Sequence, residues 1–195
     1  MTALLGGSFN PVHIGHTSLA RWMVEHGYAD ETWLMVSPHN PLKAAHNLAD
    51  EQSRLQWATL ACTDIEGISA SGFEFDLPLP SYTWQTLTAL RAAYPDKQFA
   101  LAIGADNWLC FDRWARHDWI LRHFPLLVYP RTGFPIESDN LPCGVTLMPA
   151  PLFPYSSTDI RRRLARGEDC ADAIPPAALQ AILQSGFYSS STVSH

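Results

Sequence analysis

The feature that most restricts the fold of this chain is a regular alternation of short apolar runs with longer segments of helical periodicity. The apolar runs are hydrophobic on both faces, as buried strands of a parallel sheet are. They lie at residues 3–5, 32–36, 99–103 and 126–129, and helical repeats occur at Leu19, Trp22 and Met23 and at Leu87, Leu90 and Tyr94. Strand followed by helix, repeated, predicts an α/β fold whose parallel sheet has helices on both faces.

The length and the composition favour one domain. A chain of 195 residues with 47% hydrophobic residues can bury one substantial core, so we expect a single domain over residues 1–188. Residues 189–195 are mostly small and polar, and we expect them to form a flexible tail. The proline-rich loops 37–43 and 149–154 should lie at the carboxyl edge of the sheet, where open α/β sheets bind ligands.

Charge and cysteine content argue against several classes of protein. Thirteen Lys and Arg against 19 Asp and Glu give a formal net charge of −6, which disfavours a nucleic-acid partner. The four cysteines contain no CxxC pair, which suits reduced thiols in the cytoplasm better than a disulfide scaffold or a zinc ribbon. No signal-peptide pattern and no apolar run of about 18 residues is present, so we expect no membrane association.

A glycine turn follows the first predicted strand. Gly6 and Gly7 allow a sharp turn and a close approach to a ligand, and the helix start beyond them offers free N–H groups to a phosphate. His13 and His16 are three residues apart, so a helix that begins near Ile14 would point both imidazoles toward the turn. There they could stabilise a transferring phosphoryl group. Alternatively, one histidine caps the helix and the other packs under a loop, and a zinc pair is a further alternative.

A second motif, residues 156–164, opens a helix late in the chain. Hydroxyls at a helix start are ordinarily N-caps, and an arginine run one turn later is ordinarily a solvated face. Taken together with the glycine turn, however, Ser156, Ser157 and Arg161 could hold one triphosphate from the opposite side.

With both motifs present, the sequence resembles the nucleotidylyltransferase superfamily, and within it the bacterial nicotinate-nucleotide adenylyltransferases. The resemblance runs from about Leu4 to Tyr188, and its motifs are Gly6–Pro11, His13–His16, Pro80–Leu87, Ile103–Asp106, Trp114 and Ser157–Arg161. It implies a Rossmann-like sheet of the HxGH nucleotidylyltransferase type. It also implies transfer of AMP from ATP to nicotinate mononucleotide, giving deamido-NAD and pyrophosphate in NAD biosynthesis.

The resemblance further implies roles for individual residues. Catalytic residues would be His13, His16 and Arg161. Residues that bind ATP would be Gly6, Gly7, Ser8, Phe9, His13, His16, Gly104, Asp106, Ser156, Ser157 and Arg161. Residues that bind the mononucleotide would be Lys43, Tyr82, Thr83, Asp106, Trp114 and Arg131. We expect no protein metal site, because no dense carboxylate cluster is evident, and Mg²⁺ would arrive with ATP.

Ordinary structural roles remain open for several of these residues. Trp114 could be a core tryptophan, Thr83 a helix cap, and Arg131 and Lys43 solvated surface residues. The sequence also departs from the family pattern in two places. Leu42 stands where many relatives have histidine, for which His39 could substitute, and Asn10 replaces the commoner aspartate.

Two other functions stay open from the sequence. The same chemistry could act on nicotinamide mononucleotide or another phosphate acceptor such as phosphopantetheine. A nucleotide-binding regulatory module without turnover is the third reading, although the retention of His13, His16, Ser157 and Arg161 argues against it. The sequence leaves a homo-oligomer open.

Overall fold

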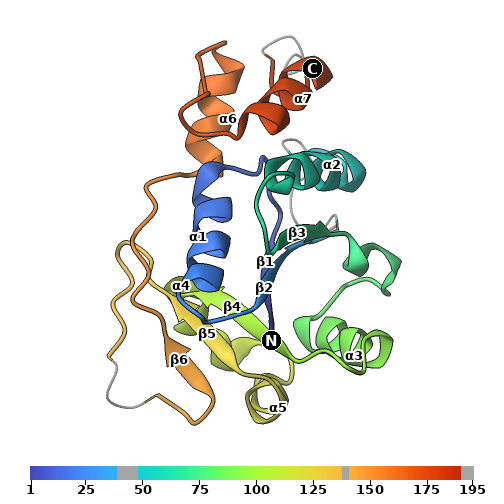
Figure 1. The fold of residues 1–195 in the computed structure, drawn as a ribbon, viewed down its shortest axis with the longest axis vertical. Coiled ribbons are helices and arrows are strands. Elements are labelled where there is room, and N and C mark those ends of the chain that lie inside the picture. The colour runs from blue at the N-terminus through green and yellow to red at the C-terminus, as the bar shows by residue number, and fades with distance from the viewer. Residues whose placement is uncertain (39–47, 138–140, 190–195) are drawn as a thin grey trace.

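A six-stranded sheet, with all its strands parallel, forms the centre of the molecule in the computed structural model (Figure 1). The structure describes residues 1–38, 48–137 and 141–189. The strands are β1 (Thr2–Gly7), β2 (Glu31–Val36), β3 (Ile68–Ser71), β4 (Phe99–Gly104), β5 (Leu126–Tyr129) and β6 (Val145–Leu147). Their order is β3-β2-β1-β4-β5-β6, the order of doubly wound dinucleotide-binding folds, so the predicted fold class is confirmed.

Helices cover both faces of this sheet (Figure 1). They are α1 (Ile14–Glu25), α2 (Glu51–Cys62), α3 (Thr83–Ala93), α4 (Ala105–Trp108), α5 (His117–His123), α6 (Ser157–Ala165) and α7 (Pro176–Ser185). Among the described residues, the 3₁₀ turn η2 (Phe73–Asp76) lies between β3 and α3, and η3 (Phe111–Arg113) lies between α4 and α5. No helix of the described residues is long and apolar enough to cross a membrane.

Two hydrophobic cores flank the sheet because successive side chains of a strand point to opposite faces. Ala3 and Leu5 of β1 join the core beneath α1, α2, α6 and α7. Leu4, between them, joins the core on the other face, which α3, α5 and η3 cover. Both faces of β1 are therefore buried, which explains its continuous apolar run.

The four predicted strands and the three predicted helices are confirmed, but other elements were not predicted. β3 and β6 are the edge strands, short and partly polar, with a neighbour on one side only. Tyr94 was placed on the periodic face of the second helix, whereas it is the residue just past the end of α3. Residues 190–195 of the predicted tail lie outside the described residues.

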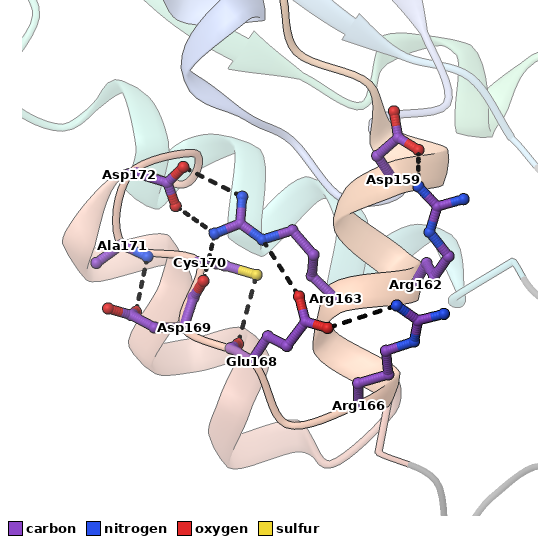
Figure 2. Close-up of polar contacts among 9 residues, drawn as sticks. All are labelled: Asp159, Arg162, Arg163, Arg166, Glu168, Asp169, Cys170, Ala171 and Asp172. Atoms are coloured by element: carbon purple, nitrogen blue, oxygen red, sulfur yellow. Dashed lines mark hydrogen bonds and ion pairs between the residues drawn. The ribbon is translucent and has the colours of Figure 1, made fainter.

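The C-terminal helices are tied to the start of α1. The Ile14 N–H donates to the Ala173 carbonyl at 2.8 Å, so the segment before α7 meets the first turn of α1. Arg163 of α6 reaches over to the same segment, where it pairs with Asp172 and donates to the Asp169 carbonyl (Figure 2). Arg162, by contrast, pairs with Asp159 on the exposed side of α6 (Figure 2). The predicted solvated arginine face therefore applies to Arg162 but not to the whole run.

Candidate active site

Two pockets open near the carboxyl edge of the sheet, where β1 and β4 lie side by side and the chain order reverses. Pocket A has a volume of about 320 Å³, and its lining includes Gly6, Gly7, Ser8, Thr83, Gly104 and Trp114. Pocket B has a volume of about 510 Å³, and its lining includes His16, Asp106, Arg131, Ser156 and Asp159. Tyr129 lines both pockets, so they meet at the end of β5.

The two histidines lie together at the start of α1. His13 is the N-cap residue and α1 begins at Ile14, as predicted. Their rings stack with centroids 3.6 Å apart, and the His13 N–H donates to Nδ1 of His16 at 3.2 Å. Phe9 stands edge-on to the His16 ring at 4.8 Å between centroids. One histidine therefore caps the helix, as the ordinary structural role requires. The sharp turn predicted at Gly6 and Gly7 is wrong, because both glycines are the last residues of β1 and the chain turns at residues 10–11 instead.

Both histidines are neutral at pH 7. Burial, followed by the positive charge of Arg131, lowers the pKa of His13 from 6.5 to about 4. Burial, His13 and Arg131 hold the pKa of His16 well below its ordinary value. His13 is 6% exposed, and its Nδ1 has no hydrogen-bond partner among the described residues. A neutral imidazole has one N–H donor, and because Nδ1 of His16 accepts a hydrogen bond, its Nε2–H is free to donate to a phosphate oxygen.

The second motif meets the first loop directly. The Ser157 hydroxyl donates to the Pro11 carbonyl at 3.0 Å. Nη1 of Arg161 donates to the Asn10 carbonyl at 2.7 Å. Ser156 is the N-cap of α6 and faces pocket B. Residues about 150 positions apart in the sequence are thus joined by hydrogen bonds. Ser157 and Arg161 themselves line neither pocket, so the clamp on a triphosphate stays a prediction.

The side chain of Asn10 explains one departure from the family pattern. Its Oδ1 accepts hydrogen bonds from the Ala49 N–H and from the Tyr188 hydroxyl. An amide oxygen serves both donors as an aspartate oxygen would, so the turn is kept while a charge is lost.

Gly104, Asp106 and Arg131 form a compact group at the end of β4. Arg131 pairs with Asp106 at 3.6 Å between Nε and Oδ1. A Cβ on Gly104 would come within 2.3 Å of the same Asp106 oxygen and 3.0 Å of Arg131, so any other residue there would displace these two side chains. Asp106 and Arg131 face pocket B, whereas Thr83 and Trp114 face pocket A. The predicted mononucleotide residues are therefore divided between the two pockets.

Helix α3 begins at pocket A. Thr83 is its first residue, and the N-cap is Tyr82, which is 47% exposed and does not line either pocket. The structure records no bond from the N–H of Thr83 or Trp84 to a described residue, which leaves an N-terminus able to receive an anion. Trp114 is half-buried against Phe111 and also lines pocket A. Its position is therefore compatible both with a packing role in the core and with contact to a ligand.

Phe9 is 2% exposed and lines neither pocket. Its ring instead lies against Gly7, where an added Cβ would be 3.1 Å away. Lys43, together with Leu42 and His39, lies outside the described residues.

Sequence reasoning missed Glu74, which lines pocket A. Burial raises its pKa, and the Thr86 hydroxyl donates to its Oε1 at 2.8 Å. Glu74 lies in a short 3₁₀ turn with no motif around it, so no local signal marked it. It matters because it places a carboxyl group in the pocket that also contains the start of α3.

Comparisons with known proteins agree with this geometry. The family model described as cytidylyltransferase-like matches residues 4–163. A "probable nicotinate-nucleotide adenylyltransferase" of Bacteroides fragilis is 44% identical over 183 residues, covering 94% of this chain and 91% of that protein. A protein of the same name in Bacteroides thetaiotaomicron is 46% identical over 168 residues, covering 86% and 83%.

Among solved structures, the nicotinic acid mononucleotide adenylyltransferase of Plasmodium falciparum, complexed with NaAD, is similar with a TM-score of 0.80. It is 18% identical, with 96% of each chain covered, so this likeness concerns the fold alone. The family model and the bacterial relatives together show that this chain belongs to the cytidylyltransferase-like family and, within it, to the nicotinate-nucleotide adenylyltransferases.

Proposed function

We propose that this chain transfers the AMP moiety of ATP to nicotinate mononucleotide, giving deamido-NAD and pyrophosphate. The observation that carries the proposal is the joining of the two motifs. Ser157 and Arg161 bond to the carbonyls of Pro11 and Asn10, directly before the stacked histidines. Residues joined in this way can hold a triphosphate from both sides, as transfer of a nucleotidyl group requires.

The two pockets suggest how the substrates divide. Pocket A takes the pyridine ring, with Trp114 available for stacking and the start of α3 for the carboxylate. Pocket B takes the ATP side, next to His16, Ser156 and Asp106. Gly6, Gly7 and Ser8, which the resemblance also assigned to ATP, line pocket A, so ATP would extend to the junction of the two pockets. Arg131, the assigned partner of the mononucleotide phosphate, borders pocket B at the end of β5, where Tyr129 joins the pockets. The attacking phosphate would therefore lie at this junction.

The chemistry needs no covalent intermediate. A phosphate oxygen of the mononucleotide attacks the α-phosphorus, the bond to the bridging oxygen breaks, and pyrophosphate leaves with that electron pair. A phosphate monoester is already anionic near pH 7, so no general base is needed. The enzyme contributes position and charge stabilisation, and His13 and His16 donate hydrogen bonds to the phosphate oxygens as charge shifts toward pyrophosphate.

We further propose that Mg²⁺ accompanies ATP. Within residues 1–38, 48–137 and 141–189, no three His, Cys, Asp or Glu side chains converge as a metal site. Asp106 offers one carboxylate beside pocket B, and its buried Oδ1 lies 3.6 Å from Nε of Arg131. This donor set fits an ion that takes most of its ligands from triphosphate and water. Mg²⁺ would neutralise part of the triphosphate charge.

Activity on nicotinamide mononucleotide is a second candidate, which Glu74 favours. A carboxyl group in pocket A can accept a hydrogen bond from an amide NH₂, whereas it repels a carboxylate when ionised.

We place the enzyme in the cytoplasm, since its cysteines are free thiols, and leave a homo-oligomer open.

Release of pyrophosphate decides among these functions. The purified protein is incubated with Mg-ATP and, in turn, nicotinate mononucleotide, nicotinamide mononucleotide and phosphopantetheine. We expect the highest kcat/KM with nicotinate mononucleotide. Binding of ATP without turnover on any acceptor would instead identify a regulatory module.

A further inference from the structure

Arg54 is a fully buried arginine in the first half of α2, with 0% of its surface exposed. Arginine is almost never fully buried unless it is paired, because removing its charge from water costs several kcal/mol. No ion pair between Arg54 and a described carboxylate is recorded, although Glu51 and Asp50 lie near enough to act on its charge. A function beyond simple packing is therefore needed to explain why this position carries a guanidinium.

The guanidinium bonds to backbone carbonyls from three segments. Nη1 donates to the Ser8 carbonyl and to the Ser37 carbonyl, each at 2.8 Å, and Nε donates to the Ala49 carbonyl at 2.8 Å. Ser8 directly follows β1, and Ser37 directly follows β2. Both of these serines line pocket A. Only the rigid, forked shape of arginine brings several donors to separate acceptors in this way.

The same two loops are also joined to each other. The Ser37 N–H donates to the Gly7 carbonyl at 2.9 Å, and the Ser37 hydroxyl donates to that carbonyl at 3.1 Å. The Ser8 carbonyl points toward Arg54, so the N–H of the same trans peptide, that of Phe9, points the opposite way. The structure records no partner for that N–H among the described residues. Arg54 thus sets the direction of a peptide in the loop that is expected to bind phosphate.

We propose that Arg54 is a positioning residue for adenylyl transfer: it fixes the Ser8 and Ser37 loops against each other and places a buried positive charge behind the loop that follows β1. This inference rests on the proposed function, since it concerns the same site. Nη2 has no partner among the described residues, so the guanidinium carries more donors than loop anchoring consumes. Its charge stays uncancelled by any direct ion pair recorded there and favours a phosphate in that loop.

Three variants distinguish a positioning role of Arg54 in catalysis from a role in stabilising the fold alone. Arg54→Lys keeps the charge but cannot bridge three carbonyls, and Arg54→Met removes both the charge and the fork. Ala58→Gly is the matched control, because Ala58 is buried one turn further along α2 and glycine weakens a helix interior. Melting temperatures, kcat and KM for each substrate are measured well below the lowest melting temperature of the set.

We expect Arg54→Met to lower kcat/KM about 100-fold, the effect of a misplaced reacting group, while Ala58→Gly stays within about twofold of wild type. Arg54→Lys should lower kcat about tenfold while KM for the mononucleotide changes less than about threefold, because the charge remains. If Arg54→Met fails to fold, the Lys variant decides: a kcat within about threefold of wild type overturns the proposal. A folded Arg54→Met that matches Ala58→Gly in kcat/KM overturns it as well.

Failure of the proposed function is distinguishable from failure of this inference. The wild-type enzyme is first tested against the panel of acceptors, and the variants are then compared with wild type on whichever acceptor it uses. A different acceptor would change the proposed substrate but leave the Arg54 ratios measurable. If the wild type turns over no acceptor, calorimetric ATP affinity is compared instead: a loss in Arg54→Met that Ala58→Gly does not share supports Arg54, and equal affinities overturn it.

Discussion

Pocket A and pocket B open near the same edge of the sheet but differ in chemistry. The described lining of pocket A is mostly apolar and hydroxyl-bearing, with Glu74 as its charged side chain. Pocket B is lined by Asp106, Arg131, Asp159 and His16. The difference indicates that one edge of a parallel sheet can hold a flat ring and a polyanion side by side, because separate loops supply each lining.

The largest expected effect is on pocket B, where His16→Ala should lower kcat by about 10²–10³. The imidazole is neutral and aligned by Phe9 and His13, so its loss removes a preorganised donor to the shifting phosphate charge. Steady-state turnover and a melting curve are measured together. A folded variant that keeps more than about half of the wild-type rate would contradict this role.

The second prediction concerns pH and the burial of His13 beneath the site. Its pKa of about 4 lies below the unfolded value of 6.5, so the unfolded chain takes up a proton first as the pH falls. Stability should therefore drop between pH 7 and pH 4, by up to about 3 kcal/mol from this group. Urea denaturation of wild type and His13→Gln across this range is the measurement. The variant should show the smaller drop, and parallel curves would contradict the assigned pKa.

Arg161→Ala should weaken ATP binding by about 10–100-fold, as expected for the loss of a charge-assisted contact. The variant also loses the bond to the Asn10 carbonyl, so some stability should go with it. Arg162→Ala is the control, because Arg162 is the next residue and pairs only with Asp159 in the described structure. Unchanged ATP affinity with a raised KM for the mononucleotide would show that Arg161 serves the other substrate.

Pocket A should prefer nicotinate to nicotinamide mononucleotide by at least about tenfold in kcat/KM, equal to about 1.4 kcal/mol. The free N–H groups at the start of α3 suit a carboxylate, and an amide would leave one of these donors unpaired. Trp114→Ala should weaken both substrates by similar factors, because both rings present the same face. Equal kcat/KM for acid and amide in the wild type would instead indicate dual specificity.

The smallest expected effect tests the carboxyl group in pocket A. Glu74→Gln removes a negative charge while keeping an acceptor for Thr86, so the acid-to-amide ratio should rise by about two- to fivefold. Asp76→Asn, in the same 3₁₀ turn but exposed, should leave the ratio unchanged. A ratio that stays constant in Glu74→Gln would show that the Glu74 charge does not reach the ring.

Local patterns were enough to predict much of the fold. The buried strands, the start of α1 at Ile14 and the N-cap at Ser156 follow from apolar runs and capping chemistry within a few residues. Edge strands such as β6 were not predicted, because a strand with a neighbour on one side only can carry polar residues and then shows no continuous apolar run. Phe9 and Tyr82 carried family resemblance, yet one is buried under Gly7 and the other is exposed at a helix cap.

The sequence by itself determined the alternation of strands and helices and the family motifs, because these depend on interactions between near neighbours. Only the tertiary structure decided that Arg161 meets Asn10, that Glu74 enters pocket A and that Arg54 holds two loops together. It also decided the low pKa values of the histidines. Burial and long-range contacts arise only when distant segments pack, and they set both the position and the charge of a side chain.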